Sequence, residues 1–248
     1  MALIDKLTAI ANAIRGKTGG TEKLTLDQMA AQISGMESGG YMFEDMAKKD
    51  AITGDIVIDY KITRGYAFAN LTGIGKVTLK NGYVDSYRTD VNNVFNSASV
   101  TEVYEDTTED LAVGNYTLNP SMFMNCTGMK KAVFKKYIPF AGCFSGCTAL
   151  EYVELGNGSI GGDNVFNNCK NLKTLVLRWP SVVNLSSAPT YWAFPFNGTP
   201  FDDNPAGTGG TVYVPAALIE SYQSATNWSA LYAAGTCSFA AIEGSEYE

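Results

Sequence analysis

The feature that most constrains the fold of this chain is a phrase that occurs twice in succession. Residues 143–155 read CFSGCTALEYVEL, and residues 165–177 read VFNNCKNLKTLVL. The shared pattern is Phe-x-x-Cys-x-x-Leu-x-x-(Val/Leu)-x-Leu, and its phenylalanines, Phe144 and Phe166, are 22 residues apart. A repeat of this length with apolar residues at fixed places is typical of a leucine-rich solenoid.

The same template finds further copies before and after this pair. One copy begins at Phe123 and another at Phe68, and degenerate copies lie at 95–103 and 196–214. We expect about six rungs, each with a short strand that ends on the Val-x-Leu pair and a return path that carries the Phe and the Cys. Because no rung can bury its apolar face alone, stacking of the rungs creates the core.

These repeats resemble the BspA-like leucine-rich repeats, in which Phe-x-(Asn/Gly)-Cys-x-x-Leu recurs at about this spacing. The resemblance covers residues 68–214 and is carried best by Cys126, Cys147 and Cys169. It implies an α+β chain built as a leucine-rich-repeat-like β solenoid. Ile56, Ile58, Tyr60 and Ile62 recur at every second position, with polar residues at 59 and 61, which predicts a strand that leads into the first rung.

The first residues predict a helical hairpin. Apolar residues recur along one side up to Gly16, and a capping box, Thr25 to Gln28, precedes a second apolar stripe that stops at Gly35. Residues 1–36 are therefore expected to form a helical domain for docking or oligomerisation, because so short a hairpin needs a partner for its stripes. A flexible joint then leads into the solenoid domain, 41–248.

Part of this hairpin also has a recognisable sequence. Residues 7–21, LTAIANAIRGKTGGT, followed by MAAQI at 29–33, resemble a module at the N-terminus of tail-associated and fibre proteins of bacteriophages and prophages. The resemblance implies attachment to other virion proteins or formation of a homo-oligomer.

The other end of the chain predicts a helical cap. Pro215 is placed to open a helix with Leu218 and Tyr222 on one side, and Asn227 is placed to cap a further turn. This order of residues resembles the C-terminal end of BspA-like arrays and predicts a lid over the last rung. Residues 237–242 are expected to add a terminal strand, and the acidic residues 243–248 are expected to be frayed.

Composition excludes several classes of function. The formal net charge of −7 opposes nucleic-acid binding, which needs clustered Lys and Arg. The chain has no histidine, which removes the commonest general base and metal ligand. Met1 is followed by no apolar signal or spanning segment, so we expect synthesis in the cytoplasm, reduced thiols and no membrane insertion. We predict no enzymatic activity, no cofactor and no metal.

Two possible metal sites are alternatives to this prediction. Cys143 and Cys147, with Cys126 and Cys169, could be read as a zinc site, but their spacing is that of the repeat, which favours small buried hydrophobic residues. The acidic run 102–110 could be a calcium loop, but it lacks the required order of ligands, which favours a solvated loop.

An aromatic insertion, 178–196, lengthens one repeat and supplies the candidate binding residues. They are Trp179, Tyr191, Trp192 and Phe194. Flat rings offer a large contact area at low entropic cost, so they could contact a sugar or a protein. The alternative is that these rings fold inward and cover the core, and the sequence leaves both possibilities open.

Together these observations predict a non-enzymatic structural protein of a phage or prophage virion, associated with the tail or fibre. The hairpin would bind other virion proteins, and the solenoid would present a surface to a bacterial glycan or protein. The alternative is a BspA-like adhesin on the bacterial cell surface. A polysaccharide-degrading tail protein, with Asp202 and Asp203 as carboxylates, is the least favoured.

Overall fold

A computed structural model describes the part of the chain that follows residue 51. The described residues are 52–58, 62, 65–80, 91–106, 118–156, 159–160, 162–185, 187–189, 191–202 and 209–248. The chain divides into two compact units, Met1–Met46 and Ala47–Glu248, and all described residues belong to the second. The predicted hairpin, 1–36, and the joint after it lie outside the described residues.

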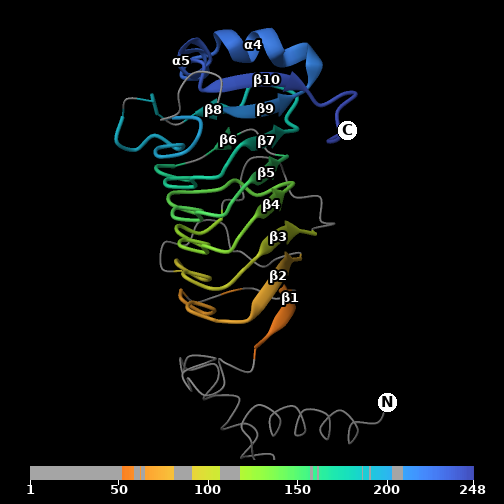
Figure 1. Cartoon of the computed structure of the whole chain (residues 1–248). Coiled ribbons are helices and arrows are strands. Elements are labelled where there is room, and N and C mark those ends of the chain that lie inside the picture. The colour runs from red at the N-terminus through yellow and green to blue at the C-terminus, as the bar shows by residue number, and fades with distance from the viewer. Residues whose placement is uncertain are drawn as a thin grey trace, which may run out of the picture. The chain divides into compact units, whose positions relative to one another are not determined.

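Parallel strands dominate the described unit. Within the described residues, one open sheet contains eight strands: β1 (Gly54–Ile58), β2 (Ile74–Leu79), β3 (Glu102–Glu105), β4 (Lys131–Phe134), β5 (Tyr152–Leu155), β7 (Thr174–Leu177), β9 (Gly210–Val214) and β10 (Cys237–Ala241). Their spatial order follows their order in the chain, and every neighbouring pair is parallel (Figure 1). A smaller sheet pairs β6 (Ser159–Ile160) with β8 (Asn184–Leu185).

Helices are few in this unit. A 3-10 turn, η1 (Ala216–Leu218), leads into α4 (Ile219–Ser224) and then α5 (Trp228–Ala234), and α4 and α5 pack against β10 at the C-terminal end of the sheet (Figure 1). The described part is thus a mostly parallel open sheet with few helices, which agrees with the α+β class expected from the sequence.

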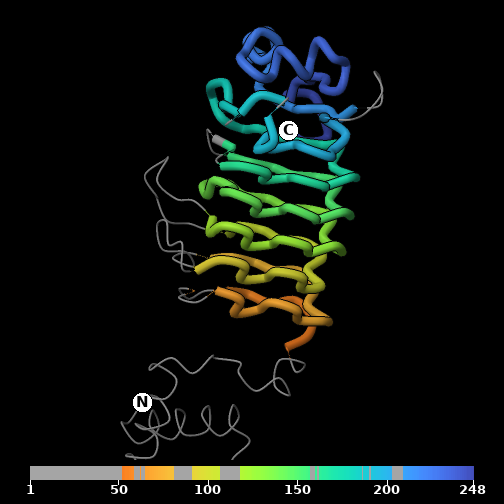
Figure 2. The backbone as a smooth tube through the Cα atoms, turned by 90° about the vertical axis from the view of Figure 1, so that its left-hand side faces the viewer, coloured from red at the N-terminus to blue at the C-terminus, as the bar shows by residue number. Residues whose placement is uncertain are grey.

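The repeat phrase sets the register of the strands. The first apolar residue of each Val-x-Leu pair lies opposite its counterpart in the next strand, as in the row Val103, Ala132, Val153, Leu175 and Val212. All members of this row are fully buried. Figure 2 shows the chain between the strands running in layers that lie one on another. Since side chains alternate across a strand, the residues between the buried ones face the other side of the sheet.

The phenylalanines of the repeats form a continuous stack beside the sheet. Neighbouring rings are 4.9 to 5.7 Å apart between centroids and nearly parallel, in the order Phe68, Phe95, Phe123, Phe144, Phe166 and Phe196. Each of these residues is at most 3% exposed. Phe95 keeps its place in the stack although the sequence pattern around it is degenerate, because the stack needs only an aromatic ring at that position.

The cysteines of the repeats are buried beside this stack. The thiols of Cys126, Cys147 and Cys169 each donate a 3.1 Å hydrogen bond to the carbonyl oxygen of a phenylalanine in the preceding layer. Burial raises the pKa of Cys126 to about 12, against a small opposing effect of a backbone hydrogen bond. These cysteines therefore act as small buried residues with one weak donor.

The backbone conformation of the residue before each repeat cysteine explains why this residue is Asn or Gly. Asn125, Gly146 and Asn168 all have positive φ, at 57°, 77° and 59°. Left-handed backbone is tolerated by Gly and, among residues with a side chain, best by Asn. The turn geometry therefore selects these two residue types.

The C-terminal end differs in two details from the prediction. Asn227 precedes α5, but its side chain makes no capping bond and instead donates to the Leu185 carbonyl oxygen at 3.3 Å. Its φ of 70° turns the chain before the helix, so Asn227 holds the predicted N-cap position but does not form the capping bond. The expected terminal strand is confirmed as β10. The segment after it, expected to be frayed, lies against the sheet, as described below.

Candidate ligand-binding face

The outward side of the sheet carries a row of polar and aromatic side chains. The register places Lys76, Glu102, Lys131, Tyr152 and Thr174 opposite one another on successive strands. All of them are partly exposed, while the residues that alternate with them in the strands are buried. A second outward row includes Tyr104, Glu154 and Tyr213. We call the side chains of these two rows, together with Arg178, the sheet face.

Cations and tyrosine rings alternate on β2 to β5. The Lys76 ammonium lies 4.7 Å from the centre of the Tyr104 ring, and the Lys131 ammonium lies 5.7 Å from the same ring and 4.7 Å from that of Tyr152. The Tyr104 hydroxyl donates to Glu102 at 3.0 Å. Burial, together with the Glu102 carboxylate, raises the pKa of Tyr104. These cation–π contacts hold the rings with one face toward a cation.

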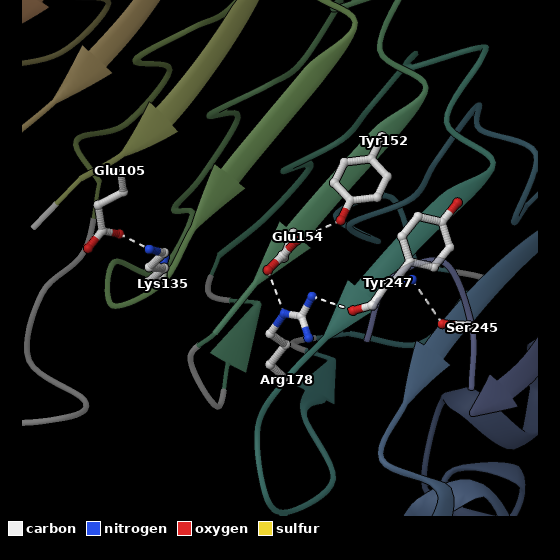
Figure 3. Close-up of polar contacts among 7 residues, drawn as sticks. All are labelled: Glu105, Lys135, Tyr152, Glu154, Arg178, Ser245 and Tyr247. Atoms are coloured by element: carbon white, nitrogen blue, oxygen red, sulfur yellow. Dashed lines mark hydrogen bonds and ion pairs between the residues drawn. The ribbon is translucent and has the colours of Figure 1, made fainter. Parts of the chain in front are cut away.

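A carboxylate organises the next part of the sheet face. Glu154 accepts hydrogen bonds from the Tyr152 hydroxyl at 2.6 Å and from Arg178 Nε at 2.5 Å (Figure 3). Burial by itself would raise the pKa of the Glu154 carboxyl, but the bonds from Arg178 and Tyr152 hold it below its usual value. Glu154 therefore remains ionised at neutral pH and keeps the guanidinium of Arg178 in one orientation.

The last residues of the sequence lie on this same part of the sheet face. Arg178 Nη2 donates to the Tyr247 carbonyl oxygen at 2.6 Å (Figure 3). The Tyr247 ring packs edge-on against Tyr213, with centroids 4.5 Å apart, and lies 5.5 Å from Tyr152. Burial, with the neighbouring Glu246 carboxylate, raises the pKa of Tyr247. The prediction that 243–248 is frayed is therefore wrong.

The structure separates the four binding residues that were predicted from the aromatic insertion. Tyr191 and Trp192 are 51% and 68% exposed, and their rings lie 5.6 Å apart. Trp179 is partly exposed. Phe194 is fully buried and packs edge-on against Phe196 of the stack, with centroids 5.8 Å apart. The hypothesis is thus corrected for Phe194, which supports the insertion from inside because its ring completes the core.

Sequence reasoning missed the sheet face, although a signal was present. In β5, Tyr152 and Glu154 alternate with the buried Val153 and Leu155. In β3 the outward pair has the reverse order, Glu102 and then Tyr104. Once the buried positions of the repeat are assigned, the positions between them must face outward. Aromatic and charged residues at those positions were the signal.

The metal alternatives find no support in the described ranges. Among those residues, no group of three or more His, Cys, Asp or Glu side chains could hold a metal ion. In the acidic run 102–110, Glu102 and Glu105 have other hydrogen-bond partners, and residues 107–110 lie outside the described residues. Of the two suggested catalytic carboxylates, Asp202 accepts from the Gly198 amide at 3.2 Å, whereas Asp203 is not described.

Comparisons with known proteins do not identify the chain. No protein-family model, no curated protein and no solved structure matches it. Among the described residues, no helix has the length and apolarity that crossing a membrane requires. A functional assignment therefore depends on the geometry of the sheet face and on the resemblances in the sequence.

Proposed function

We propose that the chain is a non-enzymatic binding protein built as a leucine-rich-repeat-like β solenoid of the BspA type. Three observations support this architecture: strands in chain order with a matched register, the unbroken stack from Phe68 to Phe196, and the positive-φ Asn or Gly before each repeat cysteine. About six rungs carry the sheet, and α4 and α5 cap its C-terminal end.

The sheet face is the observation that carries the binding function. It presents Tyr104, Lys131 and Tyr152 side by side, with carboxylates adjacent to both rings. Tyrosine rings provide a broad apolar surface of low entropic cost, and the charged groups between them fix the orientation of a polar ligand. A glycan or protein of the bacterial surface has this combination of apolar and hydroxyl-bearing or charged groups.

The place of action that we propose is a phage or prophage virion, in its tail or fibre apparatus. This part rests on the resemblance of residues 7–33 to the N-terminal module of such proteins. The N-terminal residues would bind other virion proteins or further copies of the chain, so that the sheet face is presented to a host cell. Many copies on one particle would raise a modest affinity by multivalency.

Binding to host envelopes tests this function. The full chain, labelled with a fluorophore, is titrated onto cells of the bacterial host and onto isolated envelope glycans. We expect saturable binding to cells without release of reducing ends from the glycans. Absence of saturable binding to any envelope fraction would refute the proposal, and steady release of reducing ends would point to the degrading enzyme instead.

A bacterial surface adhesin is the second candidate, and the repeats favour it. Immunogold labelling separates the two places of action: gold on particle tails supports the virion, whereas gold on intact uninfected cells, removed by surface proteolysis, supports the adhesin.

A further inference from the structure

The segment Gly244–Glu248 occupies part of the sheet face through contacts that are distant in sequence. The Arg178 to Tyr247 hydrogen bond joins residues 69 positions apart. Hydrogen bonds within the segment fix its conformation. The Tyr247 amide donates to Ser245 Oγ at 3.1 Å, and that hydroxyl donates to the Ile242 carbonyl oxygen at 2.6 Å. The segment therefore turns back onto the sheet directly after β10.

Contacts within the sheet face hold the side chains that receive the segment. Glu154 fixes the Arg178 guanidinium through Nε, which leaves Nη2 directed at the Tyr247 carbonyl oxygen (Figure 3). Tyr152 is fixed by its own bond to Glu154 and by the Lys131 ammonium over its ring. A surface held in this way loses little entropy when a ligand binds.

The chemistry of the contact is that of peptide recognition. Arg178 donates a hydrogen bond to the main-chain carbonyl group of Tyr247, and the rings of Tyr152 and Tyr213 pack against the Tyr247 side chain. The segment reads Gly-Ser-Glu-Tyr-Glu, so two carboxylates flank the tyrosine. Arg178 and Lys131 bring positive charge to this part of the sheet face, which favours an acidic segment.

We propose that Tyr152, Arg178 and Tyr213 form a docking site for an acidic peptide segment with a tyrosine between two glutamates. The chain's own Gly244–Glu248 is the ligand that occupies it in this structure. A segment of the same chemistry on a second copy of the chain, or on a neighbouring protein, competes for the same site.

The contact is suited to exchange. Glu246 and Glu248 are exposed, and Tyr247 is only partly buried. Among the described residues, the sheet order ends at β10, so the segment adds no strand to the sheet. It is held by side-chain contacts that a competing segment reproduces, while the short connection to β10 gives the internal copy a high effective concentration.

A peptide titration tests the site without reference to the host-binding function. The probe is a fluorescent peptide with the sequence of residues 243–248, acetylated and amidated at its ends, and the readout is anisotropy. The receptor is the chain shortened after Gly244, which keeps the Glu243 bond to the Ala216 amide and the buried Ile242. We expect the shortened chain to bind the peptide about tenfold more tightly than the full chain, the change that results if the internal segment occupies about 90% of the sites in the full chain.

Matched variants identify the residues responsible. In the shortened chain, Arg178→Ala should weaken binding of the peptide at least tenfold, whereas Lys173→Ala, the same loss of charge at an exposed position, should leave it within twofold. A peptide with Ala in place of its tyrosine should not bind. In the full chain, Tyr247→Ala should raise the affinity for the probe. This variant tests competition by the internal segment without shortening the chain. Equal affinity of the shortened and full chains, or indifference to Arg178→Ala, would overturn the proposal.

Discussion

Among the described residues, one carboxylate breaks the apolar pattern of the core. Glu105 pairs with Leu79 on the inward side of the sheet and is 2% exposed. Its Oε2 atom accepts from the amides of Lys135, Lys136 and Tyr137 at 3.0, 3.1 and 3.2 Å, while Oε1, among the described residues, has no hydrogen-bond partner. Three consecutive amides that follow β4 thus share one acceptor, which explains why a carboxylate is tolerated there.

The titration of Glu105 gives the first prediction. Burial raises the pKa of this carboxyl, and the three amide bonds only partly oppose the shift. The folded state therefore binds the proton more tightly than the unfolded state, and this residue adds stability as pH falls through the folded pKa toward 4.5. Each unit of the shift is worth about 1.4 kcal/mol.

Urea unfolding at pH 7 and about pH 5 measures this effect. On acidification, the wild type should gain unfolding free energy relative to Glu105→Gln, which has no proton to bind. Glu102→Gln, on the outward side of the same strand, is the control and should follow the wild type. Parallel behaviour of the wild type and Glu105→Gln would contradict the account.

At the scale of the element, the turn before each repeat cysteine decides whether neighbouring layers fit. Gly146 has a φ of 77°, and a Cβ atom at this position would meet the Asn125 side-chain oxygen of the layer before. Gly128 has no positive φ, and the nearest atom to its added Cβ is the Val100 oxygen at 3.8 Å. These two glycines form a matched pair, because one has a positive φ and no space for a Cβ atom and the other has neither constraint.

The second prediction compares alanine at these two positions. Gly146→Ala should lower the unfolding free energy by about 2 kcal/mol, through backbone strain and displacement of Asn125. Gly128→Ala should change it by less than about 0.5 kcal/mol. Thermal and urea unfolding measure both, and a loss of equal size in the two variants would show that the turn is not the constraint.

The repeat phrase made much of this element predictable, because its apolar positions are local and periodic. The strands ending at Leu79, Leu155 and Leu177 and the buried cysteines follow directly from it. Docking of Tyr247 could not be predicted in the same way, since it depends on contacts between residues that are distant in sequence and belong to no repeat. Glu105 likewise resembles any other acidic loop residue until the amides that it accepts from are known.

The candidate site was predictable only in part for a related reason. The insertion was a candidate for ligand binding because it is rich in aromatic residues. Composition alone does not reveal that Phe194 packs inward while Trp192 is exposed. The sheet face could not be predicted from one strand, because it consists of residues from several strands. Only the register between those strands shows that their outward side chains lie next to one another.

At the scale of the whole molecule, the third prediction concerns assembly. If residues 1–36 join copies of the chain, light scattering should show a defined oligomer for the full chain. A chain that begins at Gly39 should be monomeric. A monomer in both cases would refute self-association and leave docking to a different virion protein, and an oligomer in both would place the contact after residue 39.

The most direct test of the account compares the two candidate surfaces on one ligand. Tyr104→Ala with Lys131→Ala alters the sheet face, and Tyr191→Ala with Trp192→Ala alters the insertion. The first pair changes partly exposed residues and the second pair changes exposed residues. Affinity for host envelopes is measured for both variants and the wild type, after circular dichroism shows that each is folded. We predict at least a tenfold loss for the sheet-face variant and less than a twofold change for the insertion variant. Loss of binding in the insertion variant alone would contradict the sheet face as the binding surface.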